Sequence, residues 1–244
     1  DEESAATFAD YWSNKVFGFK ASVDRATIET VPERTTCNDL ASTPTEDDIA
    51  LAISKMKRGK APGPDGISAD ELKVLLEIPE SRMLLTETIT EFWNQGQPDP
   101  EWLRARLVTL PKGGNLAICK RWRPISLLQT TAKLIASIVN EKLTPFMAKH
   151  GLESQCGFRR GCGPADGFFA VKTAAMLRKE WGMETFALFC DMVAAFDSVD
   201  RATMWILLRR FGLPAKLIRL IRSLYDGMTL ELRIDRKRVD IKST

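Results

Sequence analysis

A short apolar segment places the strongest constraint on what this chain can fold into. Residues 184–191, ETFALFCD, are nearly all apolar, rich in aromatic side chains, and end in Asp191. This pattern predicts a buried strand, because a strand that is covered on both faces carries apolar side chains at successive positions. A buried strand needs neighbouring strands and covering helices, so the segment predicts a layered core with Asp191 at a strand end.

Several helices are predicted from clear start and stop signals. From Thr45 apolar residues recur at helical spacing, acids fill the first turn, and the pattern stops before Gly59. Ser68 and Glu71 form a capping box that opens a second helix. Further helical patterns cover 84–92, 134–143 with an expected end around Pro145, 165–181, and two segments that end at Gly212 and Gly227.

Short strands are predicted between these helices. ARLVTLP (105–111) is typical of a strand, and a Gly-Gly turn with a possible second strand follows it. MTLELRI (228–234) alternates apolar and polar residues, and VDI (239–241) is its expected hairpin partner. The mixture predicts an α+β fold that is rich in helix and has short antiparallel strands.

The composition excludes several classes of protein. Five cysteines without CxxC spacing argue against a disulfide scaffold or a zinc site, and the only histidine is His150. Metal or acid–base chemistry therefore rests mainly on carboxylates and lysines. No apolar run reaches the roughly 18 residues that a membrane span needs, and the acidic start is unlike a signal peptide, so an intracellular protein without a membrane partner is expected.

Positive charge is concentrated in one window although the net charge is only +3. No acidic residue lies between Glu101 and Glu141. The cations of this window are Arg104, Arg106, Lys112, Lys120, Arg121, Arg123 and Lys133. One interpretation is a solvated face whose counter-charges come from elsewhere in the fold. The other is a phosphate-binding region, since several cations flank strand ends and a Gly-Gly turn.

Two aspartates near the apolar run are candidate ligands for a metal ion. A carboxylate at the carboxyl end of a strand is a common ligand for Mg²⁺, and Asp191 has that position, but such a residue is also an ordinary turn or cap residue. Asp197 is followed by Ser198 and Asp200, a pattern more typical of helix capping. Asp191 is therefore the stronger metal-ligand candidate.

Five segments resemble, in order and spacing, the successive early motifs of reverse transcriptases. They are KAPGPDGIS, LPKGG, WRPISLL, QCGFRRG and FCDMVAAFDSVDR. The similarity, over residues 45–234, is greatest to reverse transcriptases of non-LTR (LINE-like) retrotransposons, with group II intron maturases as relatives. It implies a right-hand polymerase fold, with 1–44 as extension and linker, 45–182 as N-terminal extension and fingers, and 183–244 as part of the palm.

The same resemblance implies roles for individual residues. It implies a two-metal nucleotidyl transfer in which Asp191 and the backbone carbonyl of Met192 bind Mg²⁺. Lys112 and Arg123 would grip a deoxynucleoside triphosphate, and Phe196 would lie under its sugar. The residues implied to bind the RNA template and DNA primer are Arg121, Lys133, Gln155, Arg159 and Arg160. A nuclear or cytoplasmic location also follows from the family.

One family motif is missing from the chain. The Ala-Asp-Asp triplet, which supplies further metal-binding carboxylates, does not occur in the sequence. One aspartate cannot hold two metal ions, so the chain as given is expected not to polymerise. Two other interpretations stay open: a catalytically dead nucleic-acid-binding remnant or maturase-like module, and a Mg²⁺-dependent phosphohydrolase built on Asp191 and Asp197. The second leaves KAPGPDGIS and WRPIS unexplained.

Overall fold

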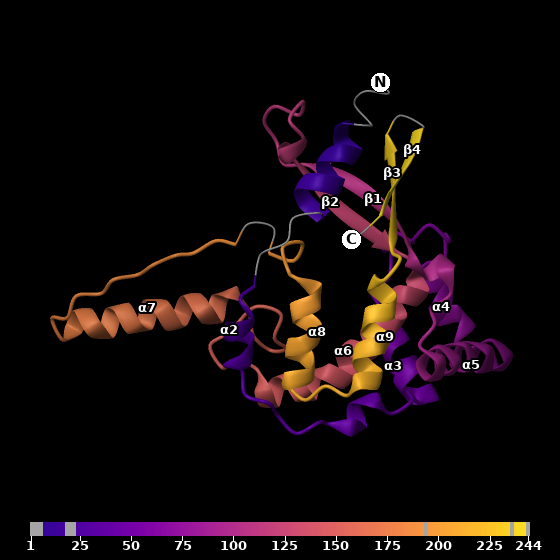
Figure 1. The fold of residues 1–244 in the computed structure, drawn as a ribbon, viewed down its shortest axis with the longest axis horizontal. Coiled ribbons are helices and arrows are strands. Elements are labelled where there is room, and N and C mark those ends of the chain that lie inside the picture. Colours follow the sequence, from indigo (N-terminus) through magenta and orange to yellow (C-terminus); the bar gives the residue numbers. More distant parts are fainter. Residues whose placement is uncertain (1–6, 18–22, 193–194, 235–236, 243–244) are drawn as a thin grey trace. The chain divides into compact units, whose positions relative to one another are not determined.

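A computed structural model describes residues 7–17, 23–192, 195–234 and 237–242 (Figure 1). The chain forms two compact units. Unit 1 comprises residues 1–138 and 194–244, and unit 2 comprises residues 139–193. Unit 1 holds the sheet and most of the helices, so the sheet and the basic window belong to the same unit.

Helices dominate both units, as the sequence predicts. Residues 7–10 are helical and lead into η1 (Tyr11–Phe17). The other helical elements of unit 1 are α2 (Arg25–Glu29), η2 (Asn38–Ala41), α3 (Glu46–Lys55), α4 (Ala69–Leu75), α5 (Pro79–Gln95), η3 (Pro100–Leu103), η4 (Cys119–Arg121), α8 (Arg201–Arg210) and α9 (Ala215–Tyr225). Helix α6 (Thr130–His150) begins in unit 1 and ends in unit 2, which also contains α7 (Pro164–Glu180).

Local signals account for the helix starts. The predicted capping box of α4 is present, with the Ser68 hydroxyl accepting from the Glu71 N–H and the Glu71 carboxylate accepting from the Ser68 N–H. The bond from the Ser68 backbone, followed by the bond from its side chain, lowers the pKa of Glu71. Thr45 and Asp48 form a second capping box at the start of α3. These starts are confirmed because they depend on residues only three positions apart.

The sheet has four strands in the order β2-β1-β3-β4. The strands are β1 (Arg104–Pro111), β2 (Trp122–Leu128), β3 (Thr229–Ile234) and β4 (Lys237–Lys242). The two hairpins β1–β2 and β3–β4 are antiparallel, whereas β1 and β3 are parallel. The prediction of antiparallel strands alone is therefore wrong: the sheet is mixed, because a long connection rather than a tight turn separates β1 from β3.

One face of this sheet is covered by the N-terminal helical segment. The register pairs Ala105 with Leu230 and Leu107 with Leu232, which places these four side chains on the same face. They are buried together with Ala9 and Trp12. Because side chains alternate along a strand, the burial of this face determines which side chains of β1 and β2 lie on the other face.

The apolar run at 184–191 is not a strand in the structure, contrary to the prediction. Residues 183–192 have no regular secondary structure, and the side chains of Phe186 and Phe189 are 90% and 86% exposed. The described strands pair only with one another, so the run has no ladder partner among them. An apolar composition permits a buried strand but cannot supply the partner that a strand requires. Asp191 therefore does not lie at a strand end here.

Helix α6 continues past the point where the sequence predicts its end. Pro145 lies inside the helix, where it cannot donate a hydrogen bond to the carbonyl of Glu141. The next residue, Phe146, is nevertheless buried, and its ring lies 4.7 Å from that of His150. Burial of Phe146 offsets the lost hydrogen bond, which explains why the helix does not stop at the proline.

The segment 29–37, called the N-terminal strap below, is bonded to the end of α8. The Arg210 guanidinium donates to the carbonyls of Val31 (2.7 Å) and Glu29 (3.2 Å), and pairs with the Glu33 carboxylate at 3.4 Å. The backbone N–H of Cys37 donates to the carbonyl of Gly212 at 2.9 Å. The strap thus connects the beginning of the chain to the turn between α8 and α9.

Gly212 offers a direct test of the strap contact. Its φ is +94°, and a Cβ at this position would lie 2.5 Å from the carbonyl oxygen of Thr35. We expect Gly212→Ala to lower the free energy of unfolding by more than about 1 kcal/mol in urea titrations. The control is Gly59→Ala, because Gly59 has φ +64° and no atom within 4 Å of its Cβ position. An equal loss in both variants would show that the strap contact adds nothing.

Candidate nucleic-acid interface on the basic hairpin

The loop between β1 and β2 is a folded structure held by its own hydrogen bonds. Gly113 (φ 88°) and Gly114 (φ 79°) turn the chain in a region that favours glycine. The Trp122 indole N–H donates to the carbonyl of Leu116 at 2.9 Å, and the Asn115 side chain accepts from the N–H of Ala117 at 3.0 Å. The loop therefore presents its cations from a defined backbone.

Three of the predicted cations lie on one face of this hairpin. Trp122 packs edge-on against Phe8 with ring centroids 6.0 Å apart, which places it on the covered face. Arg123 pairs with Leu110 and so faces the opposite side. The backbone N–H of Lys112 donates to the carbonyl of Arg121 at 2.7 Å, which extends the register by one pair. Lys112, Arg121 and Arg123 thus share the open face of the hairpin.

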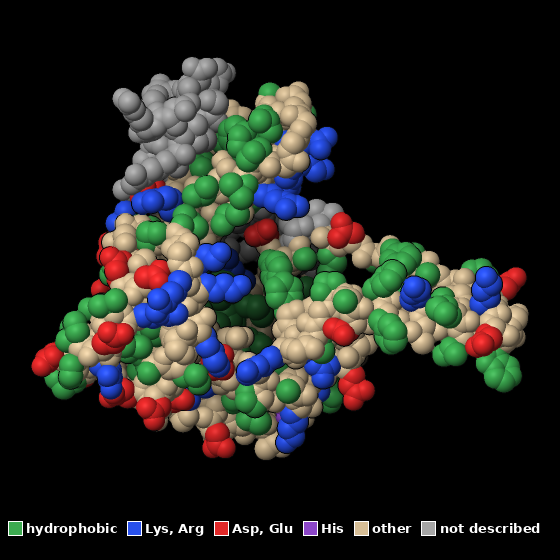
Figure 2. Space-filling model, turned by 180° about the vertical axis from the view of Figure 1, so that it is seen from behind, with side chains coloured by type: hydrophobic (Ala, Val, Ile, Leu, Met, Phe, Trp, Pro, Cys, Tyr) green, Lys and Arg blue, Asp and Glu red, His purple; other side chains and the backbone are tan. Residues whose placement is uncertain are grey.

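Within the described chain, no carboxylate neutralises these three side chains. All three are exposed, and the ion pairs found among the described residues do not include them. The Lys112 ammonium donates only to a carbonyl, that of Lys120, at 3.4 Å. Clustered guanidinium and ammonium groups beside a Gly-Gly turn form a surface that favours phosphate. Figure 2 shows the molecule from behind, with Lys and Arg side chains interspersed with hydrophobic and acidic ones over the face in view.

Lys133, another predicted contact, holds a loop of the protein in place. Its side chain is half-buried, and its ammonium group donates to the carbonyl of Ala61 at 3.3 Å. Ala61 belongs to residues 59–68, the clamp loop, which contains the whole KAPGPDGIS motif. Lys133 therefore ties α6 to this loop.

The clamp loop lies against the junction of β2 and α6. A Cβ on Gly63 would be 2.5 Å from the carbonyl oxygen of Leu128, so only glycine fits there without a shift. The buried Gln129 side chain accepts from the N–H of Asp65 at 2.9 Å, and the Thr130 hydroxyl donates to the carbonyl of Ile67. Sequence reasoning missed both buried residues. Their only signal is the Gly/Pro-rich motif that lies more than 60 positions earlier.

Unit 2 carries the predicted template-binding loop. The Arg159 guanidinium donates to the carbonyls of Leu152 (3.1 Å) and Glu153 (3.0 Å), so it stabilises the loop itself. The Gln155 side chain donates to the carbonyl of Gly157 at 3.2 Å, which is also a contact within the loop. Arg160 is exposed. Arg159 and Gln155 thus bind the loop itself, and the role of Arg160 in template binding stays a prediction.

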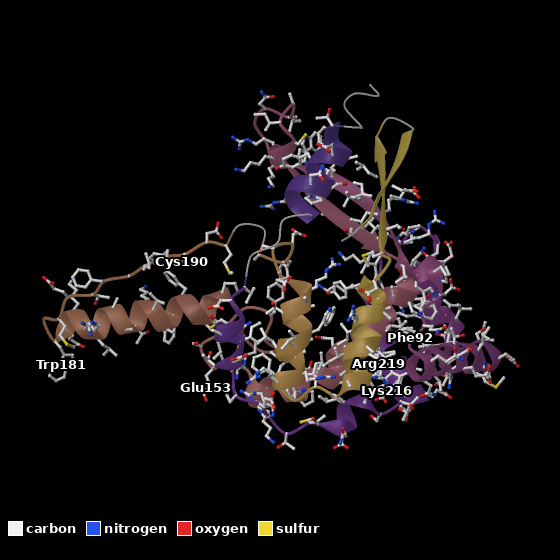
Figure 3. All side chains as sticks on the ribbon, in the orientation of Figure 1. Phe92, Glu153, Trp181, Cys190, Lys216 and Arg219 are labelled. Atoms are coloured by element: carbon white, nitrogen blue, oxygen red, sulfur yellow. The ribbon has the colours of Figure 1, made fainter. Side chains whose placement is uncertain are left out.

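Asp191 and Met192 lie in the segment that follows α7. Both are exposed, and the Met192 side chain is 73% exposed. Figure 3 labels Trp181 just after α7 and Cys190 on this segment, and green side chains lie exposed along α7 at the right of Figure 2. Among the described residues, no group of three or more His, Cys, Asp or Glu side chains is placed to hold a metal ion. Asp191 is thus a single available carboxylate.

Phe196 and Asp197 belong to unit 1 and precede α8. The Phe196 side chain is 75% exposed, so it is not a core residue of this unit. Burial raises the pKa of Asp197, and the positive charge of Arg201 opposes this rise. As predicted, capping comes from this segment: the Asp200 carboxylate accepts from the N–H of Thr203 at 2.8 Å.

The lengths and compositions of the helices also bear on membrane association. No helix in the described part of the chain is both long and apolar enough to cross a membrane.

The buried Gln129 side chain is testable without a ligand. We expect Gln129→Leu to lower the free energy of unfolding by about 1 kcal/mol or more, because the N–H of Asp65 would lose its acceptor in a partly buried site. Urea titration measures this, with Gln155→Leu as the control because Gln155 is exposed. Similar small losses in both variants would contradict the buried role of Gln129.

Comparison with known proteins gives the family. The family described as "Reverse transcriptase (RNA-dependent DNA polymerase)" matches residues 110–243, from the end of β1 to β4. The transposon TX1 149 kDa protein of Xenopus laevis is 26% identical over 193 residues, which is 78% of this chain and 14% of the relative. The Pol polyprotein of the type-1 retrotransposable element R2 from Popillia japonica is 23% identical over 77% of this chain and 25% of its own length.

A third relative covers almost the whole chain. The probable RNA-directed DNA polymerase from transposon BS of Drosophila melanogaster is 25% identical over 97% of this chain and 26% of its own length. The chain thus spans about a quarter or less of these relatives. The helix-rich α+β fold with its small mixed sheet is consistent with the family. Since the family match extends over more than half of the sequence, the chain belongs to the reverse transcriptases and is similar to those of non-LTR retrotransposons.

Proposed function

We propose that the chain is part of an RNA-directed DNA polymerase of a non-LTR retrotransposon, with the fingers and the first part of the palm of a right-hand polymerase. The observation that carries the proposal is the set of three exposed cations, Lys112, Arg121 and Arg123, on one face of the β1–β2 hairpin. Its ligands are an RNA template, a DNA primer and deoxynucleoside triphosphates. The family assignment replaces the phosphohydrolase alternative.

The hairpin cations suit phosphate chemistry in two ways. A guanidinium group presents a planar fork that binds two phosphate oxygens at once, whereas the Lys112 ammonium acts as a point charge. The two glycines after Lys112 carry no side chain that would keep a phosphate away from the backbone. We assign Lys112 and Arg123 to the triphosphate, Arg121 to the nucleic-acid backbone, and Phe196 to the sugar. Arg160 remains the proposed template contact of unit 2.

Reverse transcriptases are generally metal-dependent. The described residues of this chain supply only some of the oxygen ligands that a complete metal site requires. The Asp191 carboxylate and the Met192 carbonyl are hard oxygen donors of the kind that Mg²⁺ prefers. The described residues supply no cluster of three such side chains, so they do not fit a complete two-metal site. We therefore assign Asp191 as one metal ligand and derive no catalytic step from it.

The hairpin is tested by binding of an RNA–DNA hybrid to the full chain. We expect Arg121→Gln with Arg123→Gln to weaken binding about threefold or more and to reduce the salt dependence by about one phosphate contact, that of Arg121, because Arg123 is assigned to the triphosphate. Fluorescence anisotropy at several salt concentrations measures both quantities. The control, Lys172→Gln with Lys179→Gln, removes the same charge from exposed positions of α7. Equal effects of the two double variants would refute a specific hairpin site.

Primer extension separates binding from chemistry. With Mg²⁺, deoxynucleotides and a primed RNA template, we expect the chain to bind the hybrid without extending the primer, because its described residues bring no group of carboxylates together for two metal ions. Gel analysis of a labelled primer detects any product. Extension that is lost in Asp191→Asn would contradict this prediction and show that the chain forms a complete site.

A further inference from the structure

We propose a second contact for the nucleic-acid backbone on helix α9, formed by Lys216 and Arg219 beside Asn94 and called the α9 stripe below. This proposal rests on the proposed binding of nucleic acid by the hairpin. It goes beyond it, because the stripe lies on another element and is not among the residues implied by the family motifs.

The charge pattern of this region matches that of the basic window. No Asp or Glu occurs between Asp200 and Asp226. The cations in this stretch are Arg201, Arg209, Arg210, Lys216, Arg219 and Arg222. The stretch contains α8 and α9, so its positive charge is carried by two helices of unit 1.

Several of these cations are already engaged within the protein. Arg201 lies over the ring of Tyr225 at 5.1 Å from its centroid, and Arg222 pairs with Asp226 at 3.1 Å. Arg210 holds the N-terminal strap. Arg219 is exposed and has none of these roles. It is therefore available to a ligand without disrupting a contact of the fold.

Lys216 is positioned beside Arg219 by a neighbouring helix. Its ammonium group donates to the side-chain oxygen of Asn94 in α5 at 3.2 Å. The same oxygen accepts from the Thr43 hydroxyl at 3.2 Å, so Asn94 is itself fixed. Residues three positions apart lie on the same side of a helix, and Figure 3 labels Lys216 and Arg219 together on α9. A lysine that is held in place loses less conformational freedom when it binds phosphate.

The side of α9 that adjoins the stripe is buried and holds the helix in place. Leu217 and Leu220 are fully buried, and Leu220 lies 3.9 Å from the Cβ position of Gly96 at the end of α5. The helix is therefore fixed, with Lys216 half-buried at the border of the buried side and Arg219 on the exposed side. Two cations on an anchored helix, in a stretch without acids, favour a polyanion over a neutral partner.

The path of the chain sets the distance between the stripe and the hairpin. Helix α9 leads into β3, whose first residue pairs with the first residue of β1, and β1 then runs to the hairpin loop. At about 1.5 Å per helical residue, 3.3 Å per strand residue and up to about 3.6 Å per connecting residue, with about 5 Å across the strand pair, the two sites are at most about 60 Å apart. A duplex advances about 3.4 Å per base pair, so one of about 18 base pairs spans that distance.

The test measures the binding of a long and of a short duplex to the full chain. We expect Lys216→Gln with Arg219→Gln to weaken binding of an RNA–DNA hybrid of about 24 base pairs about fivefold or more and to lower its salt slope by nearly two. A loop-capped duplex of about 6 base pairs is too short to reach both sites. We expect it to bind to the α9 variant nearly as well as to the unmodified chain. The control is again Lys172→Gln with Lys179→Gln.

The outcomes separate this proposal from the proposed function. If the α9 variant binds the long hybrid like the unmodified chain while the hairpin variant does not, the stripe is refuted and the hairpin stands. If the α9 variant and the control weaken binding equally, the effect is general charge and the stripe is also refuted. If the α9 variant and the hairpin variant each weaken binding of the long hybrid while the control does not, both sites are supported. Circular dichroism of each variant verifies that the fold is intact.

Discussion

The pairing of β1 with strands from two distant parts of the sequence is the constraint on which the candidate site depends. β1 forms an antiparallel hairpin with β2 and a parallel pair with β3, which lies more than 100 residues later. The N-terminal helical segment covers one face of these strands. Once that face is closed, the alternation of side chains leaves Arg123, and with it Lys112 and Arg121, on the other face. The cations are therefore placed by the core that is buried behind them.

Features that depend on neighbouring residues were predictable from the sequence. The capping box at Ser68 and Glu71 and the glycine end of α5 need only a few adjacent side chains. The parallel pairing of β1 and β3 was not predictable, because no local pattern encodes which strands meet. The same limit explains the wrong strand at 184–191: its composition allows burial, but burial requires a partner that the described strands do not provide.

The candidate site also combines features that the sequence predicted with features that it did not. The acid-free window predicted the hairpin cations, because a concentration of charge is visible in the sequence. The sequence did not predict that Lys133 and Arg159 donate to backbone carbonyls of the protein itself, because only the fold brings these carbonyls close. Gln129 was missed for the same reason, as its partner Asp65 lies 64 positions away. Motif resemblance identifies functional segments, but it cannot separate residues that hold the loop from those that meet the ligand.

The central claim is that the open face of the β1–β2 hairpin binds nucleic acid. Hydrogen–deuterium exchange of the full chain, with and without an RNA–DNA hybrid, tests it most directly, because it locates the protected backbone without altering a side chain. The account predicts protection of the hairpin loop and of the facing ends of β1 and β2 when the hybrid is bound. Unchanged exchange in residues 110–123 under conditions where the hybrid is fully bound would contradict it.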